Sequence, residues 1–290
     1  MPAIDSTPNA PTRAARPRRV IAVCALAVAL ALVLSLALSA AAQGAARCTK
    51  GTTVLRVGTF NGEKGQCATI QEAVDAVEPG GWILIGPGDY KQSGYHPIAG
   101  AAGDDLAGAD ILITTPNIHM RGMNRNTVVI DGTKPGSPQC GAKESDQNFG
   151  PAEGSSFLGN NGVVVYKTSG VWLQNFSACN FLGANRGGDS IWFDGGASTG
   201  KQGLSSWWGE YLSSTSTYWG GKEPKPSDKY GIYASNTYGG PGIFYETYAN
   251  NMADSGYYIG ACPDCHAVLN RAHSENNDLG YSGSNSAATW

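Results

Sequence analysis

The sequence predicts an all-β fold, a parallel β-solenoid, on two observations. First, short apolar β runs alternate with polar turns from residue 109 to residue 196, and no segment with helical periodicity separates them. Second, Gly231, Gly256 and Gly280 recur at intervals of 25 and 24 residues, and between them Asn250-Asn251 aligns with Asn276-Asn277. A fixed period of this length is typical of a solenoid, in which each coil stacks on the previous one at the interstrand spacing.

The first 46 residues differ in composition from the rest of the chain. Arg13, Arg16, Arg18 and Arg19 precede an apolar run that begins at Val20, and small residues follow near residues 40–42. A positive segment, an apolar core and small residues of the A-x-A type are typical of a signal peptide. The apolar run is also long enough for a membrane anchor at residues 20–42. We therefore expect residues 1–46 to be a signal peptide or an N-terminal transmembrane anchor, and the rest to be secreted or extracytoplasmic.

Residues 47–290 carry 16 basic and 22 acidic residues, a formal net charge of −6, without a basic cluster. This balance argues against nucleic acid as a partner, and it leaves the N-terminal segment as the part that meets a membrane. An even number of cysteines in an oxidising compartment predicts disulfides, and pairing between neighbours in sequence is the simplest connectivity. The six cysteines concerned are Cys48, Cys67, Cys140, Cys179, Cys262 and Cys265.

A short amphipathic helix is expected at the start of the exported part. Ile70, Ala73, Val74 and Val77 fall on one helical face, and residues 79–81, Pro-Gly-Gly, end the helix. Thr69 and Glu72 have the spacing of a capping box. Trp82–Ile85 then reads as a buried strand.

Two stretches carry a resemblance to a known family: "TIQEAVDAVEPGGWILIGPGDY" at 69–90 and "PNIHMRGMNRNTVVIDGT" at 116–133. They resemble right-handed parallel β-helix proteins of the pectate-lyase-like superfamily, in which an amphipathic helix closes the start of the solenoid. The resemblance covers about residues 52–285 and implies a right-handed parallel β-helix domain at 47–290. It says little about activity, because this fold hosts lyases, hydrolases, epimerases and non-catalytic proteins.

The repeat continues almost to Trp290 without a visible cap. Because solenoids need capped ends, we expect the domain to be incomplete at its C-terminus, or to be capped by a partner or by self-association.

Residues 195–229 interrupt the rhythm of short strands and predict a long loop insertion. With Asp189, Asp194 and Glu210 nearby in sequence, aromatic side chains here suit a sugar, through ring stacking and bonds to hydroxyl groups. The alternative is that the aromatics cover the flank of the solenoid as a satellite core. The candidate substrate-binding residues are Trp207, Trp208, Tyr211 and Trp219, with Tyr218 beside them.

The resemblance implies one kind of catalysis, since polysaccharide lyases of this fold abstract a proton next to a uronate with Arg or Lys as base. They hold Ca²⁺ with Asp or Glu, so Ca²⁺ is expected only if the protein is a lyase, and no metal ligand is assigned. Residues two apart on a strand share a face, so three of the candidates are expected side by side. The alternative is an exposed polar face. The candidates are Arg271, His273, Glu275 and Glu246, with Asp278 nearby.

The stretch "CPDCH" at 262–266 matches the attachment motif of a c-type haem. Other interpretations are a zinc site with His266 and His273, a redox-active pair, or a disulfide at one corner of the solenoid. The position between two predicted coils favours the disulfide Cys262–Cys265, and no cofactor is predicted.

The functional hypothesis is that a secreted β-helix binds or modifies extracellular polysaccharide, with lyase-like or epimerase-like chemistry in the second case. The alternative is a non-enzymatic cell-surface or adhesion protein that displays a binding face. The sequence leaves open whether the protein is an enzyme.

Overall fold

A computed structural model describes residues 47–91, 94–98, 107–183, 186–196, 204–220 and 227–289. The predicted leader, residues 1–46, lies outside the described residues. Within the described ranges, no helix has both the length and the apolar character needed to cross a membrane.

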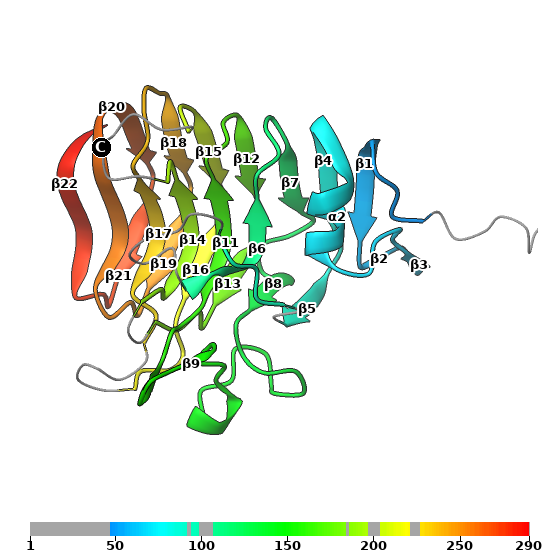
Figure 1. The fold of residues 1–290 in the computed structure, drawn as a ribbon, viewed down its shortest axis with the longest axis horizontal. Coiled ribbons are helices and arrows are strands. Elements are labelled where there is room, and N and C mark those ends of the chain that lie inside the picture. Colours follow the sequence, from blue (N-terminus) through cyan, green and yellow to red (C-terminus); the bar gives the residue numbers. More distant parts are fainter. Residues whose placement is uncertain are drawn as a thin grey trace, which may run out of the picture. The chain divides into compact units, whose positions relative to one another are not determined.

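The molecule is a parallel β-helix, and its coils present three rows of strands that we call face 1, face 2 and face 3 (Figure 1). Every strand in these rows is parallel to its neighbours. Faces 1 and 2 form one 12-stranded sheet because the long strand β20 turns from one face to the other. Face 3 is a separate 6-stranded sheet. The predicted fold class is confirmed.

The elements have the following bounds. Face 1 consists of β6 (Ala109–Ile113), β11 (Asn161–Tyr166), β14 (Asp189–Asp194), β17 (Tyr230–Ser235), the first part of β20 (Ser255–Asn270) and β22 (Leu279–Thr289). Face 2 consists of β1 (Thr52–Val57), β4 (Val77–Ile85), β7 (His119–Gly122), β12 (Val171–Gln174), β15 (Trp207–Glu210), β18 (Gly242–Tyr245) and the last part of β20. Face 3 consists of β5 (Gly88–Lys91), β8 (Val128–Asp131), β13 (Ser177–Cys179), β16 (Ser213–Thr215), β19 (Tyr248–Asn250) and β21 (His273–Glu275).

Four short strands form two antiparallel hairpins, and two short helices complete the described part of the chain. They are β2 (Thr59–Phe60), β3 (Glu63–Lys64), β9 (Ala152–Glu153), β10 (Ser156–Phe157), α2 (Ile70–Ala76) and η2 (Glu144–Asp146). Helix α2 begins as expected, since the Glu72 amide donates to Thr69 Oγ1 at 3.1 Å and the Glu72 carboxylate accepts from the Thr69 amide. Its apolar side packs on the core at the start of the solenoid, as the resemblance implies.

The strand register confirms the predicted glycine repeat. Tyr230 pairs with Ser255 and Ser255 with Leu279, so the glycine that follows each of them stacks on the next. The predicted asparagine alignment is wrong by one residue, because Asn250 pairs with Glu275 and not with Asn276. Phe244 pairs with Leu269, so the coil keeps a spacing of 25 residues, whereas the two asparagine pairs lie 26 apart.

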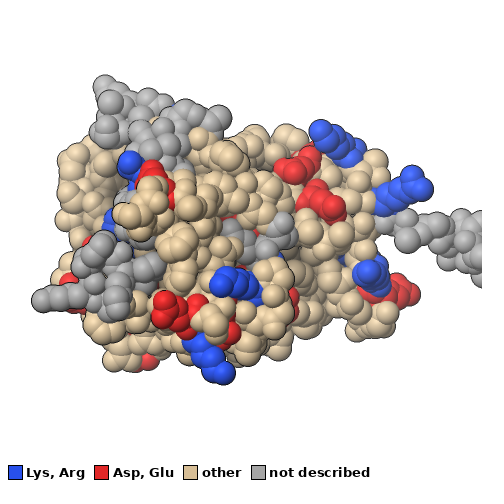
Figure 2. Space-filling model, turned by 60° about the horizontal axis from the view of Figure 1, so that its bottom comes forward, with Lys and Arg blue, Asp and Glu red and all other residues tan. Residues whose placement is uncertain are grey.

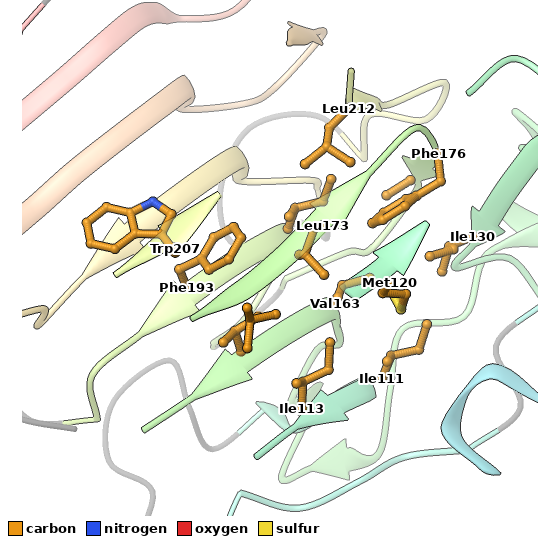
Figure 3. Packing of buried hydrophobic residues seen from close by; sticks show 14 of the residues in the cluster. Ile111, Ile113, Met120, Ile130, Val163, Leu173, Phe176, Phe193, Trp207 and Leu212 are labelled. Carbon is orange, nitrogen blue, oxygen red and sulfur yellow. The ribbon is translucent and has the colours of Figure 1, made fainter. Parts of the chain in front are cut away.

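The core runs through the interior of the coils, and every second strand residue points into it. Figure 3 shows Trp207, Phe193 and Leu173 directed into this interior. The Trp207 ring lies 6.2 Å from that of Phe193 and 6.5 Å from that of Phe244. Gly242, in the next coil, pairs with Trp207. A Cβ at position 242 would overlap the indole, so the absence of a side chain there leaves room for the tryptophan ring.

The prediction that residues 195–229 form one long loop insertion is wrong for residues 207–215. Strand β15 pairs in register with β12 and β18, and β16 pairs with β13 and β19, so residues 207–215 belong to a regular coil. The reason is the buried indole of Trp207, which fills the core as its neighbours do. The extra residues lie on either side of this coil, at 195–206 and 216–229, and 197–203 and 221–226 among them lie outside the described residues.

The described residues contain three disulfides, each between cysteines that are neighbours in sequence: Cys48–Cys67, Cys140–Cys179 and Cys262–Cys265. The last one lies in β20 between the part that pairs with β17 and the part that pairs with β18. Both of its cysteines are fully buried, whereas His266 is exposed. The motif therefore forms a corner of the solenoid, and its two thiols are joined to each other.

Candidate functional site

A groove of about 610 Å³ lies on the outer side of face 3. Ser177 pairs with Ser213, Ser213 with Tyr248, and Tyr248 with His273, so all four side chains form one outward row. The two serine side chains are small and leave a depression, and the larger side chains of Tyr248 and His273 line it on one side. The lining residues are Arg125, Asn126, Ser177, Ser213, Thr215, Glu246, Thr247, Tyr248, Asn250, Arg271 and His273.

One edge of the groove is a corner where the backbone is left-handed in successive coils. The φ angles are 62° at Asn175, 52° at Tyr211, 52° at Glu246 and 55° at Arg271. Asparagine tolerates this conformation, whereas tyrosine, glutamate and arginine adopt it at a cost in free energy. Asn175 Nδ2 donates to the Gly122 carbonyl of the neighbouring coil at 2.9 Å, and Arg271 Nε donates to Glu246 Oε1 at 2.8 Å. Backbone strain of this kind often accompanies a functional surface.

Tyr248, His273 and Glu275 form a second polar cluster. The Tyr248 hydroxyl donates to Glu275 Oε1, and His273 Nε2 lies 3.2 Å from Glu275 Oε2. The rings of Tyr248 and His273 stack, with centroids 5.4 Å apart and planes at 20°. The hydrogen bonds from Tyr248 and then from His273 lower the pKa of Glu275. The hydrogen bond to Glu275, and then burial, raise the pKa of Tyr248. Glu275 is therefore a weak base, and Tyr248 keeps its proton.

Arg125 is a groove residue that the sequence did not reveal. Its Nη1 donates to the carbonyl oxygen of Glu246 at 2.9 Å, and its own carbonyl accepts from Ser177 Oγ at 2.6 Å. In the same turn, the Asn126 amide donates to Asn124 Oδ1 at 2.9 Å. The asparagines of "NRN" signal a turn in the sequence, but only the stacking of coils brings residue 125 next to residue 246.

The four aromatic residues predicted to bind a sugar do not lie together in the structure. Trp207 is fully buried in the core, so its predicted role as a sugar platform is wrong. Trp208 points outward, but one face stacks on Trp172 with centroids 4.5 Å apart, and Ile243 is its register neighbour on the other side. Its ring faces are covered, so it is not a platform either. Tyr211 is 44% exposed and Trp219 is 69% exposed, and these two remain accessible.

Trp208 belongs to a stack that runs along the outside of face 2. We call Trp82, His119, Trp172 and Trp208 the aromatic row, since they come from four consecutive coils and all are half-buried. The ring centroids lie 4.2, 5.3 and 4.5 Å apart in that order. Burial lowers the pKa of His119.

The acidic residues considered for sugar contacts lie outside the groove. Asp189 and Asp194 are fully buried, and Asp194 Oδ1 accepts from the Gly196 amide at 2.9 Å, so it holds a turn. Glu210 Oε2 accepts from Gln174 Nε2 at 2.7 Å. Asp278 lines a different hollow. On the face shown in Figure 2, acidic and basic side chains are scattered over a surface made mostly of other residues.

A calcium site fits poorly with the described side chains. Glu246 is paired with Arg271, and Glu275 with Tyr248 and His273. In the described ranges, one group of potential metal ligands lies close together, namely Asp131, Cys140 and Cys179. Its cysteines are joined in a disulfide, and Asp131 Oδ2 accepts from Lys91 Nζ at 2.6 Å. This donor set does not fit a cation.

Comparisons with known proteins add little to this geometry. No family model matches the chain, and no curated protein sequence matches it. Among solved structures, the chain is similar to the pectin methylesterase PemA from Erwinia chrysanthemi. The sequence identity is 14%, the match covers 79% of this chain and 67% of that chain, and the TM-score is 0.31. The fold assignment therefore rests on the strand register described above.

Proposed function

We propose that this protein binds an extracellular polysaccharide in the groove on face 3. The observation that carries the proposal is the groove itself, with a floor of Ser177 and Ser213 and walls that hold arginine, glutamate and aromatic side chains. Its volume lies in the range of ordinary ligand sites. The disulfides agree with an extracellular location, which the predicted leader also favours.

The groups in the groove match the chemistry of a sugar chain. The guanidinium groups of Arg125 and Arg271 offer hydrogen-bond donors, and the carboxylate of Glu246 accepts from hydroxyl groups, as does that of Glu275 next to the groove. The stack of Tyr248 and His273 adds an aromatic surface next to them. Since Glu246 holds Arg271 and Glu275 holds Tyr248, these side chains are fixed before a ligand arrives, which reduces the entropy lost on binding.

The same pairing favours binding over turnover. A general base works best when its pKa lies near the working pH and when it can reach the proton that it removes. Arg271 is engaged by Glu246, and the pKa of Glu275 is lowered by its two hydrogen bonds. A protein that displays a binding face therefore fits these contacts better than a lyase or an epimerase, and turnover is an outcome that the test below decides.

Affinity electrophoresis of the full chain tests the proposal, with polygalacturonate, alginate, xylan and mannan as probes, with and without Ca²⁺. We expect at least one polysaccharide to retard the protein, and Arg125→Ala and Tyr248→Ala each to weaken binding about tenfold, which is about 1.4 kcal/mol. Arg56→Ala is the matched control, because Arg56 is exposed outside the groove, and it should bind as the wild type does.

Two results would change the conclusion. Equal binding by the wild type and both groove variants would overturn the groove as the site. An increase in ultraviolet absorbance from an unsaturated product, lost in Arg271→Ala, would show lyase activity and replace binding alone by catalysis.

A further inference from the structure

A second hollow, of about 540 Å³, lies at the other end of the strands that form the groove. The groove extends along β16 and β19 to their last residues, Thr215 and Asn250, and the hollow begins at the residues that follow, Ser216 and Asn251. Strands of three residues extend about 10 Å, so the two sites are close neighbours on face 3. The hollow is lined by Ser216, Thr217, Tyr218, Trp219, Asn251, Met252, Ala253, Asn276, Asn277 and Asp278.

Trp219 is the unusual residue of this hollow, because 69% of its side chain is exposed. Among the exposed large apolar residues in the described ranges it has the highest exposure. An indole left in water gives up the free energy that its burial would provide, and it presents an apolar ring face that a ligand can cover. Trp219 also lies next to polar side chains, whereas each tryptophan of the aromatic row stacks on another ring.

The backbone that carries Trp219 is held in place on several sides. Trp219 forms a β-bridge with Ser227. Two residues earlier, the Thr217 amide donates to Asn180 Oδ1 at 2.8 Å and Thr217 Oγ1 donates to the Cys140 carbonyl at 2.6 Å. The ring of Tyr218 contacts that of Phe149, with centroids 6.1 Å apart. The backbone that carries the exposed indole is therefore held relative to the solenoid, which reduces the entropy lost when a ligand binds.

The polar side of the hollow contains both structural and unengaged groups. Asn277 Oδ1 accepts from the Met252 amide at 2.7 Å, and Asn251 Nδ2 donates to the Ser216 carbonyl at 3.0 Å, so these two side chains hold the walls. In the described part of the chain, the side chains of Asn276 and Asp278 have no hydrogen bond or ion pair to protein groups. Both are exposed beside Trp219.

We propose that this Trp219 hollow is a subsite for a neutral sugar unit, and this rests on the proposed polysaccharide binding. A pyranose ring has an apolar face that stacks on an indole and a rim of hydroxyl groups that hydrogen-bond to amide and carboxylate groups. Asn276 offers a donor and an acceptor, and Asp278 offers acceptors. Among the described lining residues, Asp278 is the charged one, and its carboxylate disfavours an acidic sugar at this position.

The position of the subsite next to the groove also indicates the path of a bound polysaccharide over the surface. A polysaccharide that occupies both sites runs along β16 and β19, across the direction in which the coils stack. Its unit at Trp219 is neutral, and its next units lie over Thr215, Asn250 and Tyr248.

The experiment measures dissociation constants of neutral xylo-, cello- and manno-oligosaccharides for the full chain by calorimetry, with oligogalacturonate as the acidic counter-probe. We expect Trp219→Ala to raise the dissociation constant of a neutral oligosaccharide by a factor of about ten or more, which corresponds to about 1.4 kcal/mol. Trp219→Phe keeps a stacking ring and should lose less affinity than Trp219→Ala, and Asp278→Asn should raise the affinity for oligogalacturonate relative to that for the neutral probes. Tyr238→Ala, which removes another exposed aromatic, is the control. Circular dichroism checks the fold of each variant.

The outcomes separate this inference from the proposed function. If neutral probes bind Trp219→Ala as they bind the wild type, while Arg125→Ala loses polysaccharide binding, the subsite is overturned and the groove stands. If Trp219→Ala alone loses the neutral probes, the subsite stands without the groove. If no neutral oligosaccharide binds the wild type, or if only oligogalacturonate does, the neutral subsite is overturned, and the polysaccharide panel decides the groove by itself.

Discussion

The aromatic row on face 2 and the groove on face 3 are both outward rows of side chains from consecutive coils, yet their surfaces differ. In the aromatic row, flat rings repeat from coil to coil and cover each other's faces at centroid distances of 4.2 to 5.3 Å. In the groove, the residue type changes from serine to tyrosine to histidine, and a depression forms where the small side chains lie. Where similar flat side chains repeat from coil to coil, they cover one another and leave no depression. Where the side-chain volume changes between coils, a depression forms.

An aromatic residue on the outside of the solenoid is not by itself a sugar-binding surface. Sugars need an accessible ring face, and a tryptophan between two stacked neighbours offers only its edge. Trp208 is therefore part of the wall of the solenoid, although it is adjacent in sequence to a stretch rich in Tyr, Trp and Gly. Trp219 has no ring stacked on it among the described residues, so exposure and stacking together distinguish a platform from a wall.

The largest expected effect on stability comes from Trp207, which points into the core and precedes Trp208 of the aromatic row. Trp207→Ala removes a fully buried ring that packs against Phe193 and Phe244, and we expect the free energy of unfolding to fall by about 3–5 kcal/mol. Trp208→Ala, one residue on, removes a stacked outward ring and should cost about 0.5–1.5 kcal/mol in stacking. Urea denaturation measures both. Equal losses would contradict the assignment of the two residues to core and wall.

A smaller effect is expected from His119 as the pH falls. Burial lowers the pKa of His119 in the folded protein below its usual value of about 6.5. The unfolded chain then binds the proton more readily, so the free energy of unfolding decreases as the pH falls through about 6.5 toward the folded pKa. His119→Phe keeps a ring in the row and removes this part of the pH dependence. Thermal melts between pH 5 and 8 measure it, and an unchanged slope in the variant would refute the prediction.

The smallest effect on stability is expected at the groove corner. The Arg271 side chain is 67% exposed and that of Glu246 is 28% exposed, so their ion pair should contribute less than about 1 kcal/mol. A double-mutant cycle with Glu246→Gln and Arg271→Ala gives the coupling in urea denaturation. A coupling as large as the cost of Trp207→Ala would mean that the pair holds the fold and not the binding surface. Added salt should weaken the pair.

Much of the fold could be predicted because local chemistry dictates it. The capping box of Thr69 and Glu72, the period shared by Gly231 and Gly256, and the corner cysteines each depend on residues close in sequence or at a constant spacing. The candidate residues His273 and Glu275 also lie side by side, since they are two apart on one strand.

The rest of the site could not be predicted, because it depends on which residues meet across coils. Arg125 lies 121 residues from Glu246 in sequence, and a hydrogen bond joins them. Whether Trp207 or Trp208 faced the core depended on the register of β15, in which Gly242 of the next coil leaves room for the Trp207 ring.

By itself, the sequence determined the solenoid, its first helix, its glycine period and its pairs of neighbouring cysteines, since these follow from residue types at short or regular intervals. Only the tertiary structure decided which outward side chains are covered and which are open. A side chain's own chemistry does not say whether the residue above it in the next coil is a ring or a serine. That neighbour comes from a remote part of the chain, and its volume decides whether a wall or a groove results.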